Sequence, residues 1–93
     1  MFSKTYFAVV HEDKGGPWKY IVEFPDLDHL PSEENTLNGV HTMAKEILEC
    51  KIEDILEHCE VPPEPTEDYD EILKKADPEA GPVAFVLGVH VEV

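Results

Sequence analysis

The chain has 93 residues, a length that fits one small domain with a modest core. Hydrophobic residues make up 42% of it, and its formal net charge is -14, from 21 acidic residues against 7 basic ones. The apolar content excludes a disordered chain, and the charge argues against direct nucleic-acid binding, because phosphate repels a polyanion. A basic protein surface is the expected complement.

The chain shows no targeting or membrane signal. Its first residues, MFSKTYFAVV, are too polar for a signal peptide, and no run approaches the roughly 20 apolar residues of a membrane span. Cys50 and Cys59 would lie about 13 Å apart along a helix axis, whereas the Cα atoms of a disulfide lie within about 7 Å. The sequence therefore predicts free thiols and a cytoplasmic protein.

Three strands are predicted, over residues 4–12, 18–24 and 83–92. The segment TYFAVV is apolar on both faces, which is typical of a central strand. Alternation in the second strand predicts one buried side, and Lys19, Ile21 and Glu23 on the other. That buried side comprises Trp18, Tyr20, Val22 and Phe24. The last strand has alternating apolar positions opposite His90, namely Val83, Phe85, Leu87, Val89, Val91 and Val93.

Residues 37–59 are predicted to form an amphipathic helix, with Thr36 as its N-cap and Gly39 weakening its first turn by about 1 kcal/mol. The predicted apolar stripe comprises Leu37, Val40, Ala44, Ile47, Leu48, Ile52, Ile55, Leu56 and Cys59. Residues 61–82 form a proline-rich acidic connector, in which DYDEILKK predicts a short helix with Ile72 and Leu73 facing inward. We expect residues 1–93 to be a single domain.

Several short sequence motifs, taken in their order along the chain, resemble the N-terminal domain of HicB antitoxins. They are the strand TYFAVV, the turn HEDKGG, the strand WKYIVEFPDL, the helix start TLNGVHTMAKEIL, the stretch VPPEPT and the valine-rich final strand. The resemblance implies an α+β domain with a partial RNase H-like fold, in which three or four largely antiparallel strands carry one long helix on one face. It also implies that the chain neutralises a small basic mRNA-cleaving toxin of the HicA type by covering its RNA-binding or catalytic surface.

Two departures from the HicB pattern limit what the resemblance implies. Residues Asp28 to Pro31 replace the usual Pro-Gly-Cys, so this turn must be built differently. Many HicB proteins continue into a DNA-binding domain, whereas this sequence ends at Val93, so operator binding is not carried over.

Two groups of carboxylates are the predicted partner-binding residues. The loop group, which is the first choice, follows the second strand and comprises Asp26, Asp28, Glu33 and Glu34. The helix ridge comprises Glu46, Glu49, Glu53 and Glu57. Both groups could instead be an ordinary solvated acidic surface.

An RNase H-related nuclease or an RNA-binding domain is the alternative function. A two-metal nuclease needs converging carboxylates, but TYFAVV contains none, and Glu23 and Asp26 do not automatically share a face. Aromatic side chains could stack on RNA bases, but no basic residues flank them. They are Tyr6, Phe7, Trp18 and Tyr20.

The histidines and cysteines match no metal-site spacing. The histidines are scattered over the chain, at His11, His29, His41, His58 and His90. We therefore predict no catalytic residue, no metal and no cofactor. The long last strand would leave a free sheet edge, so a homodimer or a higher homo-oligomer is also expected.

Overall fold

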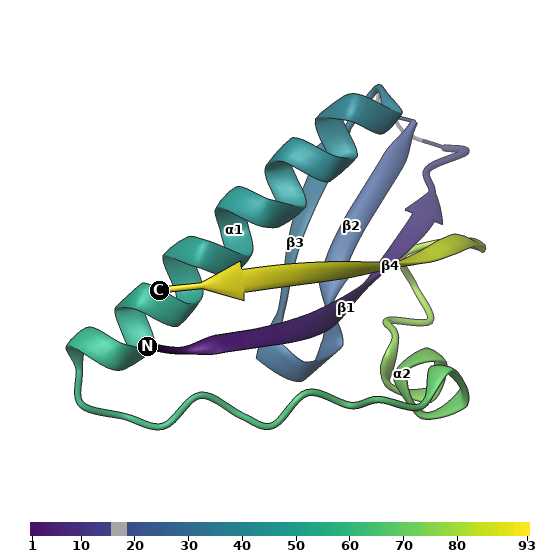
Figure 1. The fold of residues 1–93 in the computed structure, drawn as a ribbon. Coiled ribbons are helices and arrows are strands. Elements are labelled where there is room, and N and C mark those ends of the chain that lie inside the picture. Colours follow the sequence, from purple (N-terminus) through teal and green to yellow (C-terminus); the bar gives the residue numbers. More distant parts are fainter. Residues whose placement is uncertain (16–18) are drawn as a thin grey trace.

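The computed structural model describes residues 1–15 and 19–93, which form an antiparallel sheet with a long helix on one face and a short helix on the other (Figure 1). The strands are β1 (Ser3–Glu12), β2 (Tyr20–Phe24), β3 (His29–Glu34) and β4 (Val83–Glu92). The helices are the 3-10 turn η1 (Pro25–Leu27), α1 (Leu37–Glu57) and α2 (Tyr69–Lys75). The α+β class is as predicted, and the sheet has four strands.

The strand order is β3-β2-β1-β4, so the prediction of TYFAVV as a central strand is confirmed. Strand β4 lies at one edge and pairs with β1 along its length. The register shifts between Val10, which pairs with Phe85, and His11, which pairs with Val83. This bulge turns Val83 toward the face of His11. The predicted alternation is therefore wrong at Val83, although Phe85 packs against the main core.

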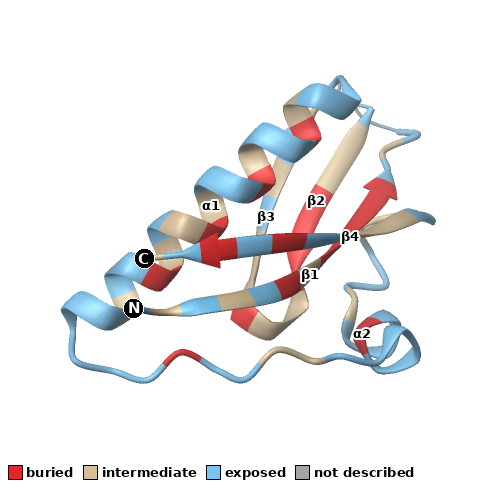
Figure 2. Ribbon diagram, viewed as in Figure 1, coloured by how far each residue is buried: buried red, intermediate tan, exposed pale blue. Residues whose placement is uncertain are grey.

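The main core lies between the sheet and α1 (Figure 2). From β1 it takes Tyr6, Ala8 and Val10, whose spacing of two puts them on one face of the strand. From α1 it takes Val40, Ala44, Leu48 and Ile52, which are fully buried. The predicted inward side of β2 is confirmed by Tyr20, Val22 and Phe24. Trp18, predicted beside them, lies outside the described residues.

Helix α1 begins as predicted, because the Thr36 hydroxyl accepts a hydrogen bond from the Gly39 N–H at 2.9 Å. It ends at Glu57, two residues before the predicted end, and Cys59 has a left-handed backbone with a φ of 56°. The apolar stripe is shorter than predicted, since Leu37 at its start and Leu56 near its end are exposed and Cys59 lies beyond the helix. In the described part of the chain, no helix is long and apolar enough to cross a membrane. Both cysteines are free and exposed, as predicted for the thiols.

The connector and α2 cover part of the other face of the sheet. Ile72 of α2 and Val9 of β1 are fully buried there, and the Tyr69 ring lies 4.9 Å from the Phe7 ring, centroid to centroid. Leu73 is exposed, so the prediction for α2 is right for Ile72 and wrong for Leu73.

Candidate functional site

Asp26 of the loop group is a structural residue. Its side chain is only 6% exposed, and its carboxylate accepts hydrogen bonds from the N–H and the hydroxyl of Thr66, both at 2.7 Å. Lys75 lies 3.3 Å from the same carboxylate. Burial alone would raise the pKa of Asp26, but the Thr66 hydrogen bonds and Lys75 outweigh burial and lower it. The expectation that Asp26 projects toward a partner is therefore wrong.

The other three members of the loop group are arranged differently from one another. Asp28 is exposed and has a left-handed backbone, with a φ of 60°. Glu33 and Glu34 belong to β3, so they lie on a strand and not on a loop. Glu33 is exposed, whereas Glu34 is half-buried and lies so close to Gly39 that a Cβ atom there would come within 2.5 Å of its carboxylate. Asp28 and Glu33 remain free to meet a partner.

The helix ridge lies on α1, and most of it is exposed. Glu46, Glu53 and Glu57 are exposed, and Glu49 is half-buried. Glu49 also lies 3.7 Å from the Lys45 ammonium, one helical turn away. An acidic ridge of this kind is available to a partner along α1.

A cluster of two buried residues, His11 and Glu23, and the half-exposed His29 forms on the sheet face opposite α1. His11 and Glu23 are each 1% exposed, and the His11 Nε2 atom is hydrogen-bonded to the Glu23 carboxylate. His29 Nδ1 lies 2.5 Å from the second oxygen of Glu23. The backbone N–H of Asp77 donates to both oxygens, at 3.0 and 3.3 Å. The cluster ties β1, β2, β3 and the segment after α2 together.

Proton positions in this cluster follow from its acceptors. The Gly81 carbonyl can only accept, so the His11 Nδ1–H donates to it, at 2.9 Å. One further proton must then lie between His11 Nε2 and Glu23. Whichever of the two atoms carries that proton, the buried His11–Glu23 pair is electrically neutral. A neutral pair avoids much of the cost of burying an isolated charge.

Sequence reasoning missed this cluster. It described the histidines as scattered, and it placed Glu23 on the outward side of the second strand. The face assignment was correct, but the segment at Asp77 covers that face from 54 residues away. Neither periodicity nor a local motif signals a contact between such distant residues.

Two surface hollows lie on either side of the left-handed segment Asp28 to Leu30. One, of about 450 Å³, is lined by Glu23, His29, Glu33 and Asp77 among others. The other, of about 470 Å³, lies against α1 and includes Leu30. Among residues 1–15 and 19–93, no group of three or more His, Cys, Asp or Glu side chains is placed to hold a metal ion.

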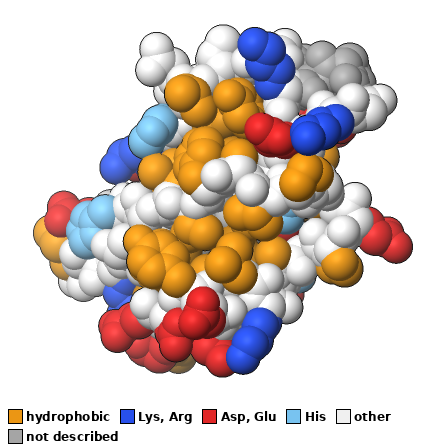
Figure 3. Space-filling model, turned by 90° about the vertical axis from the view of Figure 1, so that its right-hand side faces the viewer, with side chains coloured by type: hydrophobic (Ala, Val, Ile, Leu, Met, Phe, Trp, Pro, Cys, Tyr) orange, Lys and Arg blue, Asp and Glu red, His pale blue; other side chains and the backbone are white. Residues whose placement is uncertain are grey.

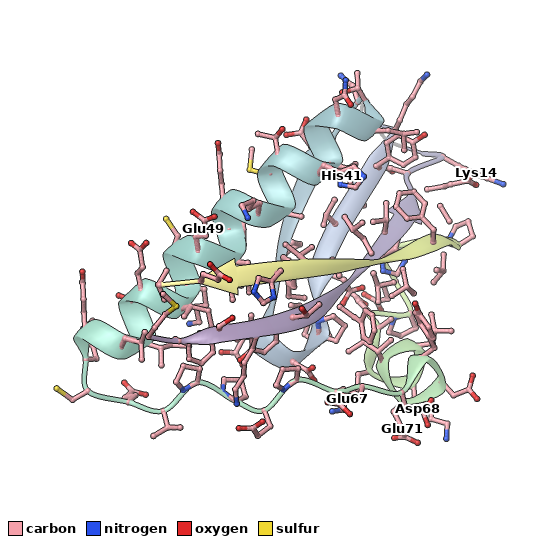
Figure 4. All side chains as sticks on the ribbon, in the orientation of Figure 1. Lys14, His41, Glu49, Glu67, Asp68 and Glu71 are labelled. Carbon is pink, nitrogen blue, oxygen red and sulfur yellow. The ribbon has the colours of Figure 1, made fainter. Side chains whose placement is uncertain are left out.

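Further exposed acidic residues surround α2 and were not among the predicted partner-binding residues. Glu67, Asp68 and Glu71 lie together at one end of the molecule, well away from Glu49 on α1 (Figure 4). Asp70 is exposed beside them. The chain therefore has separate acidic regions on α1 and around α2.

Comparison with known proteins identifies a similar fold. No protein-family model matches the chain, and no curated protein sequence matches it. The structure is similar to a chain in a solved structure described as a toxin-antitoxin complex from Streptococcus pneumoniae, with a TM-score of 0.74 and 20% sequence identity. The match covers 98% of this chain and 70% of that chain. At this identity the likeness establishes a shared fold.

Proposed function

We propose that this chain is an antitoxin-like protein that binds and neutralises a small basic toxin of the HicA type. The observation that carries the proposal is a net charge of -14 on a fold shared with a chain of a toxin-antitoxin complex. A negative surface can occupy the positive surface with which an RNA-cleaving toxin holds its substrate. Neutralisation of this kind requires binding only.

The structure leaves fewer acidic groups available for binding than the sequence predicts. Asp26 is engaged with Thr66 and Lys75, so the proposal keeps Asp28 and Glu33 from the loop group. From the helix ridge it keeps Glu46, Glu53 and Glu57, which are exposed. Long-range attraction by such exposed charges weakens as salt rises, because the Debye length falls from about 10 Å at 0.1 M to about 3 Å at 1 M.

We further propose that the chain is HicB-like, with a partial RNase H-like fold and no catalytic activity of its own. The order of its strands and long helix supports the family assignment. Glu23 and Asp26 bind different partners, at His11 and at Thr66. The nuclease alternative therefore has no shared carboxylate site at these two residues.

We also propose that a second copy pairs with or covers the free edge of β4. This strand has 10 residues, and β1 is its neighbour in the sheet. A long unpaired edge leaves N–H and C=O groups available to another chain. Lys45 reaches one of them, the His90 carbonyl, at 3.4 Å.

Co-expression tests the antitoxin role in cells. The proposal requires that a reading frame adjoining this gene encodes a small basic protein. That protein is induced with or without this chain, and growth and total RNA integrity are followed. We expect growth to stop with the basic protein alone and to recover when this chain is present. Growth arrest that persists at equal expression levels would contradict the proposal. A frameshifted copy of this chain is the control for transcription load.

A further inference from the structure

We infer that the basic partner docks on an apolar patch on the sheet face that α1 leaves uncovered, next to α2. This inference rests on the proposed function and specifies the surface of direct contact. The exposed carboxylates of α1, with Asp28 and Glu33, then contribute long-range attraction to the basic partner and not direct contact. The patch consists of Phe7, Tyr69, Leu73, Val83 and Val86. None of these residues was among the predicted partner-binding residues.

The residues of the patch come from three elements, β1, α2 and β4. Phe7 and Val86 point to the same face of the sheet, because Phe7 is opposite Gly88 and Val86 is opposite Val9 in the β1–β4 register. Gly88 has no side chain, and a Cβ atom there would lie only 3.6 Å from the Phe7 ring. The bulge after Val10 turns Val83 to this face as well.

Helix α2 adds two exposed side chains to the patch. Tyr69 contacts Phe7 by its ring and is still 57% exposed, and Leu73, one turn later, is 40% exposed. Hydrophobic side chains run across this face of the molecule (Figure 3). Exposed apolar side chains gathered on one face are typical of interaction sites. Tyrosine is also among the commonest hot-spot residues of protein interfaces.

Acidic residues form the rim of the patch. They are exposed, come from α2 and the turn before it, and comprise Glu67, Asp68, Asp70 and Glu71. In Figure 3, acidic side chains gather along the lower edge of the hydrophobic surface. An apolar centre with a negative rim complements a partner whose apolar contact residues are surrounded by lysines and arginines.

The two lysines of α2 leave most of this rim negative. Lys75 is bound to Asp26 and Thr66, whereas Lys74 lies 3.3 Å from Glu71 and offsets one of the four rim carboxylates. The Lys75 contacts and the Asp77–Glu23 hydrogen bonds also hold α2 against the sheet. The patch is thus preorganised, which lowers the entropic cost of binding. With 7 basic residues against 21 acidic ones, a second copy complements this rim poorly, so a basic protein is the proposed occupant.

Binding of the purified basic protein from the adjoining reading frame tests this surface by biolayer interferometry. We expect Tyr69→Ser and Leu73→Ser each to weaken binding by about tenfold or more, as truncation of a central contact does. Leu56→Ser is the matched control, because Leu56 is a helical leucine with 39% exposure on α1, outside the patch. We expect it to bind within about twofold of wild type, as peripheral positions do. Circular dichroism melts verify that each variant is folded.

The possible outcomes separate this inference from the proposed function. If the wild type fails to bind the basic protein, both are overturned. If the wild type binds and both patch variants bind as tightly as Leu56→Ser, the antitoxin role stands and the docking surface is wrong. If sedimentation shows a dimer of this chain alone that Tyr69→Ser dissociates, the patch serves self-association and the inference is overturned.

Discussion

Replacing Glu23 by alanine should destabilise the fold strongly, although the alternation of its strand predicts that the Glu23 side chain faces away from the core. The substitution removes the acceptor for His11, His29 and the Asp77 N–H. Three hydrogen bonds at about 1 kcal/mol each give about 3 kcal/mol. Leaving His11 buried with an unpaired ring nitrogen adds at least about 1 kcal/mol. The expected loss is therefore about 4 kcal/mol.

That loss is large for a chain of this size. A domain of 93 residues has a free energy of unfolding of about 5 to 14 kcal/mol, at 0.05 to 0.15 kcal/mol per residue. Urea titration followed by circular dichroism measures the difference between variant and wild type. Glu33→Ala is the control, because Glu33 is exposed and lines the same hollow. We expect it to change stability by less than about 0.5 kcal/mol.

The double variant His11→Phe with Glu23→Leu separates the buried pair from its surroundings. Replacing both partners by apolar side chains removes the unpaired group, so it should recover part of the loss seen in Glu23→Ala. A Glu23→Ala protein within about 1 kcal/mol of wild type would refute the assignment of this cluster as a structural anchor.

Three other substitutions test local features. Asp26→Asn should lower the free energy of unfolding by about 2 kcal/mol at pH 7. Because folding lowers the Asp26 pKa, only the wild type loses this stability as pH falls below the ordinary pKa of 3.8. Urea titrations in which both proteins lose the same stability at acid pH would contradict this. Burial, with the charges of Glu64 and Asp26, raises the pKa of Tyr6 to about 12. The Tyr6 hydroxyl therefore stabilises the folded state below pH 10, and this stabilisation is lost as pH rises toward 12. Absorbance titration should show an ionisation near pH 12 that Tyr6→Phe lacks. Gly81→Ala should destabilise the fold by about 2 kcal/mol or more. Gly81 has a φ of 108°, and a Cβ atom there would lie 2.6 Å from the Glu12 carbonyl oxygen. A thermal melt unchanged from wild type would rule this out.

Elements with a clear periodicity were predictable from the sequence. The last strand was placed at residues 83–92, as observed, because its apolar residues alternate over a long run. The long helix began at the predicted residue, since Thr36 has the hydroxyl that a helix N-terminus needs. Strand β3 carries too few apolar residues for a clear alternation, so the sequence left open whether the sheet has three or four strands.

The candidate site was less predictable, because its residues are set by contacts between distant segments. The sequence predicts Asp26 as an exposed loop carboxylate, whereas in the structure Thr66, 40 residues later, binds it. Val83 changed face through a bulge that leaves no signal in the alternation. Tyr69 lies in a proline-rich connector, where one exposed aromatic residue carries no periodicity. Pairwise contacts of this kind depend on the whole fold.

Titration of RNA cleavage with this protein is the most direct test of the antitoxin role. The purified basic protein from the adjoining reading frame is held at a fixed concentration with a labelled RNA, and this chain is added in steps. We expect cleavage to fall in proportion to the added chain and to stop near an equimolar ratio. Full cleavage at a severalfold excess of folded chain would contradict the central claim.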